Sequence, residues 1–271
     1  MDAEAGDGPA PLGPFDVAPG AWSRHVELRD GTPVLLRQIR PEDRDRLAEG
    51  LRRLSPPSRY LRFHTDLEEL TERQLDYLTQ VDHIDHEAIV ALDLDDPDAP
   101  GVGVARYIRD AHQRHVAEAA ITVADEYQGK GAGTLLLGVL STHARQHGIE
   151  VFRNYVLASN SAMLEVFDHL GAHRELETTG LWRVDLPLPE HERDLPDSPA
   201  GRAFMRAAKD GLRLSNLFPP VLCHLPRRLW GREEEADGGS IEAELTSLRD
   251  ELSTWLADRE RRDPAWPAED D

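Results

Sequence analysis

The stretch AAITVADEYQGKGAGTLLL, residues 119–137, decides the fold. Residues 119–123 are small or β-branched, as in a buried strand, and the Leu, Val and Ala pattern of residues 134–147 predicts an apolar helix. Between the two, Gly129, Gly131 and Gly133 lack a Cβ atom, so the backbone can adopt positive φ and approach a ligand closely. The stretch therefore predicts a strand, a glycine-rich turn and a helix N-terminus in succession.

The predicted turn has the properties of an anion site. The first N–H groups of a helix have no partner within the helix and lie at the positive end of its dipole, so a pyrophosphate is the expected ligand. The spacing differs from two common phosphate loops, since G-x-x-x-x-G-K-[ST] is absent and G-x-G-x-G is not the dinucleotide pattern G-x-G-x-x-G. For the glycines alone, the alternative interpretation is a flexible turn before a helix.

The string Gln128-Gly129-Lys130-Gly131-Ala132-Gly133, after a strand that ends at Val123, resembles the Q/R-x-x-G-x-G/A signature of the GNAT superfamily of N-acetyltransferases. The resemblance implies acetyl-CoA as co-substrate. It also implies an α/β (α+β) fold with a mixed central sheet of six to seven strands flanked by helices, to which this chain would add a helical C-terminal extension. The residues that it implies for binding acetyl-CoA are Ile121, Val123, Gln128, Gly129, Lys130, Gly131, Ala132, Gly133, Thr134 and Asn160.

Each of these residues has an implied role. The amides of residues 128–134 would hold the pyrophosphate, and the strand through Ile121 and Val123 would lend backbone groups to the pantetheine arm. Asn160 is placed like the family's Asn after the next strand, whose side chain contacts that arm. A simpler interpretation of Asn160 is a helix N-cap, and both can hold together.

The order of the predicted elements matches the GNAT order. Periodicity and turn signals predict strands at 25–28, 34–39, 87–94, 101–109, 115–124, 150–157, 175–177 and 181–186, and helices at 41–54, 59–63, 71–80, 134–147 and 161–170. The GNAT domain is placed at 23–189. A disordered tail, rich in Ala, Gly and Pro, is expected over 1–22, and a linker with a helical C-terminal extension over 190–271.

Two stretches of the first half narrow the resemblance. LSPPSRYLRF (54–63) and VDHIDH (81–86) are similar to the corresponding stretches of bacterial protein-lysine acetyltransferases of the Pat type, which act on acyl-CoA synthetases. The likeness implies a protein lysine as the acceptor amine. A cyclic-nucleotide-binding domain is often fused to Pat enzymes, and none is recognised in this sequence.

Acetyl transfer requires a group that removes a proton from the acceptor, because a free lysine amine has a pKa of about 10.4. Glu118 lies on the strand before the glycine-rich turn, on the opposite face from Ile121 and Val123. It matches the Glu that acts as general base in Pat-like members, directly or through a water. The alternative is a solvated strand carboxylate. Without a cysteine near the motif, direct transfer in a ternary complex is expected rather than an acyl-enzyme.

The general acid is not identified by the resemblance. Many members carry a Tyr seven residues after the Asn, where this chain has Phe167. Water or Tyr155 is then left to protonate the leaving thiolate.

No metal is predicted. The run Asp82–Glu87 has metal-ligand residue types without a spacing that specifies a site, and the family needs no metal. His112, His115 and His143 are interpreted as surface or helix-face histidines.

The composition limits the partners. A formal charge of −20, from 31 basic and 51 acidic residues, argues against binding to nucleic acid or an anionic membrane. The single Cys223, with no signal peptide and no membrane span, favours a cytoplasmic location. Ile241, Leu245, Leu248, Leu252 and Trp255 form a short apolar seam that would pack on the domain or pair two subunits in a homodimer.

Three functions follow, in order. The first is an acetyl-CoA-dependent N-acetyltransferase acting on a protein lysine. The second is a small-molecule amine N-acetyltransferase, because substrate loops vary most within a fold. The third is a non-catalytic acetyl-CoA-binding regulator, in keeping with Phe167 and the unassigned C-terminal region.

Overall fold

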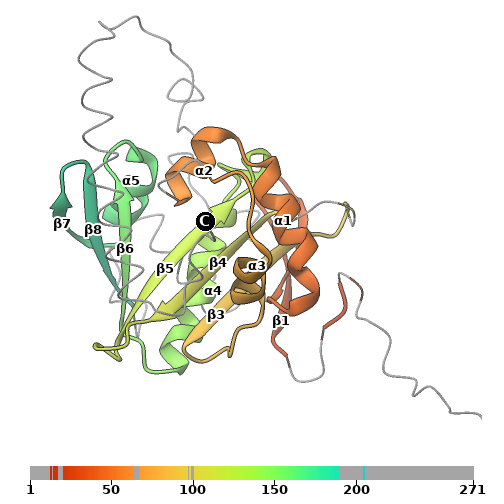
Figure 1. Ribbon diagram of the computed structural model, residues 1–271, viewed down its shortest axis with the longest axis horizontal. Helices are drawn as coiled ribbons and strands as arrows, with labels where there is room; N and C mark the ends of the chain where they lie inside the picture. The colour runs from red at the N-terminus through yellow and green to blue at the C-terminus, as the bar shows by residue number, and fades with distance from the viewer. Residues whose placement is uncertain are drawn as a thin grey trace, which may run out of the picture.

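A mixed sheet of eight strands, in the order β1-β2-β3-β4-β5-β6-β8-β7, forms the centre of the molecule (Figure 1). The computed structural model describes residues 13, 15–17, 21–63, 67–96, 98, 101–189 and 204. Neighbouring strands are antiparallel except β5 and β6, which run parallel. The strands are β1 (Ser23–Glu27), β2 (Pro33–Gln38), β3 (His86–Asp93), β4 (Gly103–Arg109), β5 (Val116–Val123), β6 (Val151–Leu157), β7 (His173–Thr178) and β8 (Leu181–Pro187).

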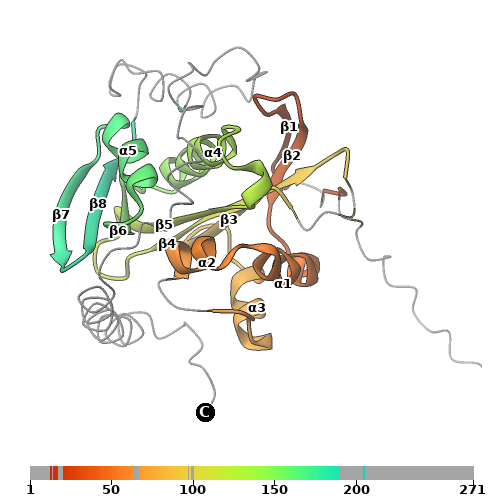
Figure 2. The same cartoon turned by 90° about the horizontal axis from the view of Figure 1, so that it is seen from above.

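Helices cover both faces of the sheet. Figure 2 shows α1, α2 and α3 on one face and α4 on the other. The α-helices are α1 (Arg44–Arg53), α2 (Pro56–Phe63), α3 (Glu72–Thr79), α4 (Ala132–Gln146) and α5 (Ser161–His169). Two short 3-10 helices precede α1 and α4: η1 (Pro41–Asp43) and η2 (Asp125–Tyr127). Within the part of the chain that the structure describes, no helix combines the length and the apolar character needed to cross a bilayer.

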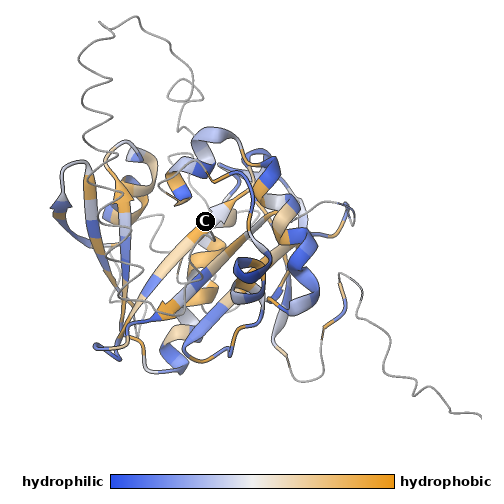
Figure 3. Cartoon of the chain, viewed as in Figure 1, coloured by the Kyte–Doolittle hydropathy of each residue, from blue (hydrophilic) through white to orange (hydrophobic). Residues whose placement is uncertain are grey.

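Strand alternation divides the apolar side chains into two layers. On the α4 face, Leu135, Leu136 and Leu140 are fully buried against strand residues such as Phe152. Each buried leucine contributes about 1.5–3 kcal/mol, so α4 anchors the larger core. On the other face a smaller cluster, which includes Leu35, lies below α1–α3. Figure 3 shows apolar residues along α4 and the central strands and polar residues on the outer sides of α1 and α3.

The predicted fold class and element order are confirmed. The sheet has eight strands rather than six to seven, because the hairpins β1–β2 and β7–β8 both pair into it. Helix α4 begins at Ala132, two residues before its predicted start, and Thr71 caps α3 through the predicted capping box with Gln74.

The proposed boundaries at residues 22 and 190 stay predictions. Most of 1–22 and all of 190–271 except Phe204 lie outside the described residues. Trp22 packs edge-on against His143, with ring centroids 4.9 Å apart, and Phe204 is buried in the larger core. The apolar seam from Ile241 to Trp255 is not described, so the homodimer also stays a prediction.

Candidate active site

The sheet opens between β5 and β6. These two strands pair only where Val116–Glu118 meets Val151–Arg153, although β5 continues to Val123 and β6 to Leu157. Figure 1 shows the two strands diverging beyond this contact. Backbone N–H and C=O groups need partners, and those along the facing edges of the opening have none from the other strand. An extended ligand arm with amide groups can supply them.

The glycine-rich turn lies at one end of this opening. Gly129 and Gly131 have φ of 73° and 91°, and Gly131 is the N-cap of α4 without a side-chain cap. Gly133 is not left-handed; it lies in the first turn of α4, where an added Cβ would meet Val123 Cγ2 at 3.7 Å. The expectation of positive φ is therefore confirmed for two of the three glycines.

The start of α4 is built to accept an anion. The first N–H groups of α4, at Ala132, Gly133 and Thr134, have no acceptor within the helix, and the helix dipole is positive at this end. Gly129 has open space where a side chain would stand. The turn thus fits the predicted pyrophosphate without rearrangement of a side chain.

The side chain of Lys130 does not point into the turn. Its ammonium lies 2.8 Å from Asp30 Oδ2, in the β1–β2 turn, and 5.0 Å from the centroid of the Tyr127 ring. Burial by itself raises the pKa of Asp30, but hydrogen bonds from Lys130 and Thr32 outweigh it and lower the pKa to about 2. Lys130 therefore fixes the turn to the β1–β2 hairpin.

Gln128 joins the turn to α2. Its Nε2 donates to Val123 O at 3.2 Å and to Asp125 Oδ1 at 2.9 Å. Asp125 in turn accepts the Ser55 amide at 2.8 Å and the Ser58 hydroxyl at 2.5 Å. The first turn of α2 is thereby held to the loop between β5 and α4. Asp125 was not recognised as a site residue, because its partners are about seventy residues away.

Glu118 lies half-buried on β5, one residue from the end of the β5–β6 pairing. It shares a face of the strand with Ala120, Thr122 and Ala124, and this face lines a cavity of about 320 Å³ between the sheet and α1–α3. The cavity wall is mainly apolar, formed by residues such as Leu51 of α1. Ile121 and Val123 point to the opposite face and pack against the core.

Arg106, on the neighbouring strand β4, is the most buried cation of the cavity wall, 5% exposed. Its Nη1 and Nη2 both donate to the Leu78 carbonyl at 3.2 Å, and Nη1 lies 3.1 Å from His86 Nε2. Burial, with the charge of Arg106 adding to it, lowers the pKa of His86 to about 3. His86 is therefore a neutral acceptor at pH 7.

Asn160 and Tyr155 lie on the far side of the opening. Because β5 and β6 are parallel, the glycine-rich turn and Asn160 both follow strand ends at the same edge of the sheet. Asn160 accepts the Met163 amide at 3.3 Å as the N-cap of α5. Tyr155 packs with Leu61 of α2, on the cavity side of the sheet, whereas Phe167 is buried in the larger core.

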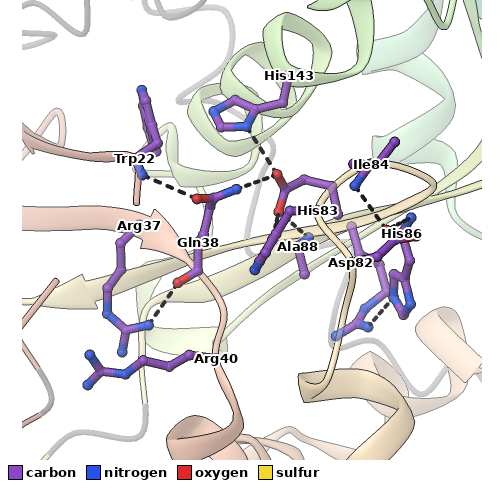
Figure 4. Close-up of polar contacts among 12 residues, drawn as sticks. Trp22, Arg37, Gln38, Arg40, Asp82, His83, Ile84, His86, Ala88 and His143 are labelled. Carbon is purple, nitrogen blue, oxygen red and sulfur yellow. Dashed lines mark hydrogen bonds and ion pairs between the residues drawn. The ribbon is translucent and has the colours of Figure 1, made fainter. Parts of the chain in front are cut away.

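A second polar centre lies on the α4 face. Glu87 is fully buried and accepts hydrogen bonds from His83 Nδ1 at 2.7 Å, His143 Nδ1 at 3.1 Å and Gln38 Nε2 at 2.8 Å. Figure 4 shows Gln38, His83 and His143 converging from three elements. The interpretation of His143 as a surface or helix-face histidine is wrong, since it is buried on the inner face of α4. No three side chains of the described residues are arranged to hold a metal ion.

Comparison with known proteins identifies the family. Residues 49–172 match the model of the acetyltransferase (GNAT) family. The chain is 36% identical over 144 residues to an acetyltransferase of Pseudomonas aeruginosa, covering 53% of this chain and 77% of that protein. It is 34% identical over 164 residues to acetyltransferase Pat of Mycolicibacterium smegmatis, covering 60% of this chain. The chain spans about half, 48%, of the length of that Pat protein.

The solved structures agree. The crystal structure of the GNAT domain of S. lividans PAT superposes with a TM-score of 0.57 at 28% identity, over 62% of this chain and 97% of that domain. The expected resemblance to Pat-type proteins is thus confirmed, together with the opened sheet and the glycine-rich helix start. The chain belongs to the GNAT family of acetyltransferases, and acetyl-CoA is its co-substrate.

Proposed function

We propose that the chain transfers the acetyl group of acetyl-CoA to the side-chain amine of a protein lysine, with Glu118 as general base. The observation that carries the proposal is the position of Glu118, which faces the cavity at the point where β5 and β6 separate. An acetyl group at the end of an arm lying in that opening would be next to this carboxylate.

The residues divide the reaction between them. The amides of residues 128–134 hold the pyrophosphate, and the free edges of β5 near Ile121 and Val123, together with Asn160, hold the pantetheine arm. Glu118 accepts a proton from the ammonium, directly or through a water, and the neutral nitrogen attacks the thioester carbonyl. The C–N bond forms as the C–S bond breaks. Water or Tyr155 returns a proton to the coenzyme A thiolate.

The choice of a protein lysine rests on the Pat-like relatives. The strongest specific candidates for the acceptor are acyl-CoA synthetases, from the Pat-type likeness of 54–63 and 81–86. The leucines of the cavity wall are suited to cover a four-carbon lysine stem while its amine reaches Glu118. A cytoplasmic location agrees with such substrates and is part of the proposal.

The experiment that tests the function uses radiolabelled acetyl-CoA. Purified protein is incubated with lysate proteins, with purified acyl-CoA synthetases and with a panel of free amines, and Glu118→Gln serves as the blank. Label on particular proteins, lost with the variant, is the expected result. Label on small amines alone would select a small-molecule acetyltransferase. Coenzyme A binding without label on any acceptor would indicate a regulator.

Gly133→Val is expected to weaken coenzyme A binding at least tenfold, because a branched side chain in the first turn of α4 would occupy the path of the pyrophosphate to the free amides. Gly131→Val adds backbone strain, since its φ is 91°, and should also lower the melting temperature. Calorimetry with coenzyme A measures both. Gly133→Ala is the matched control: it fits the helix and should leave affinity within about threefold. Unchanged affinity in both Val variants would refute the assigned anion site.

A further inference from the structure

The cavity next to Glu118 contains a buried positive charge without an acidic partner. No carboxylate of the described residues lies within ion-pair distance of Arg106, whose guanidinium meets only the Leu78 carbonyl and the neutral His86 ring. Burial, and then the charge of Arg62, lowers the pKa of Arg106 to about 9, so the side chain is still charged at pH 7. A buried cation satisfied by neutral groups alone is energetically costly, and a bound anion would relieve that cost.

The cavity's own acids do not supply this anion. Asp43 faces the cavity, but both of its oxygens are held by Arg37, at 2.7 and 2.5 Å, and one also accepts the Arg40 amide. The other acid of the wall is Glu118, the proposed base. In the β4–β5 register Arg106 lies opposite Ala120, so Glu118 is its diagonal neighbour on the same face. Such neighbours are about 7–8 Å apart.

The second cationic wall residue strengthens the same bias. Arg62, on α2, lines the cavity from the helix side, and its charge is close enough to act on Arg106 across the space. Two cations from different elements thus face one cavity in a chain whose net charge is −20. The amine end of an acceptor fits Glu118, and the adjoining space fits a negative group.

We infer that Arg106 binds a carboxylate of the acceptor, so that the preferred acceptor is an amine with a carboxylate within a few bonds or one side chain of it. The inference rests on the proposed acetyl transfer and adds the class of acceptor. The carboxylate has two sources: the α-carboxylate of a free amino acid, or an acidic side chain beside the target lysine of a protein. Arg and carboxylate pair through charge-assisted hydrogen bonds, which are stronger than neutral ones.

Matched acceptors test the inference. L-lysine is compared with L-lysinamide, and a peptide with Glu beside its lysine with the same peptide carrying Gln. The wild-type kcat/KM is expected to favour the carboxylate form of one pair by about tenfold or more, and that pair identifies the source. Arg106→Gln should bring the ratio close to one, whereas Arg106→Lys should keep part of it. Arg52→Gln, on the exposed side of α1, is the matched control and should leave the ratio unchanged.

Binding measured without turnover separates this inference from the proposed function. With coenzyme A present, calorimetry should show the carboxylate form binding about tenfold more tightly than the amide form to the wild type, and equally to Arg106→Gln. If both forms are acetylated or bound equally by the wild type, the inference is overturned while acetyl transfer stands. If Arg106→Gln lowers all rates equally and keeps the ratio, Arg106 only fastens the end of α3. Should that variant fail to fold, Arg62→Gln is used, and it should lower the same ratio.

Discussion

Glu118→Gln is expected to lower kcat for acetyl transfer about 100-fold or more, with acetyl-CoA affinity changed less than about threefold. The amide has nearly the shape of the carboxylate but cannot accept a proton from the ammonium. Because Glu118 lies on the cavity face of β5 and not at the glycine-rich turn, its loss should leave the pyrophosphate site intact. Steady-state kinetics with the best acceptor, and calorimetry with acetyl-CoA, measure the two quantities.

The base assignment also predicts how the defect depends on the acceptor. An amine that is already neutral at the assay pH needs no proton removed before attack, so the loss caused by Glu118→Gln should shrink for acceptors of lower pKa. Glu150→Gln, an exposed carboxylate just before β6, is the control and should keep wild-type turnover. A variant with near-normal kcat, or a defect that is equal for all amines, would remove Glu118 from the role of base.

The sequence alone predicted the features that depend on local chemistry. The alternation along 116–123 placed Glu118 on the opposite face from Ile121, and this face lines the cavity. The glycine spacing at 129–133 predicted a tight turn before a helix, since only glycine adopts positive φ at little cost. Such signals involve residues within about one helical turn of each other, so one sequence is enough to see them.

The features that depend on distant contacts were not predictable. Lys130 appeared to be a phosphate ligand by position, but its ammonium pairs with Asp30, one hundred residues earlier. Asp125 and Arg106 appeared ordinary, because their roles arise from α2 and α3 folding over the sheet. The run Asp82–Glu87 was recognised as unusual for its ligand residue types, yet the partner that explains Glu87 is His143, on another element. Pairings of this kind leave no local pattern.

Glu87→Gln is expected to lower the free energy of unfolding at pH 7 by about 3 kcal/mol. Burial by itself raises the pKa of Glu87, but the hydrogen bonds from His143, His83 and Gln38 outweigh it and lower the pKa from 4.5 to about 2. The charged carboxylate is thus a better partner for these three donors than a neutral group would be. Removing the charge loosens the contacts that hold β2, the loop before β3, and α4 together. Urea unfolding at pH 7 measures the loss.

The sign of the pH dependence separates this explanation from simple loss of packing. A carboxyl whose pKa is depressed in the folded state contributes stability above its ordinary pKa, and the contribution disappears as the pH falls from about 4.5 towards 2. The stability difference between wild type and Glu87→Gln should therefore be constant from pH 7 to 5 and narrow below that. Glu49→Gln removes an exposed carboxylate on α1 that pairs with Arg53, and should cost less than about 0.5 kcal/mol. A difference for Glu87→Gln that stays the same down to pH 3 would show that shape, and not charge, makes Glu87 important.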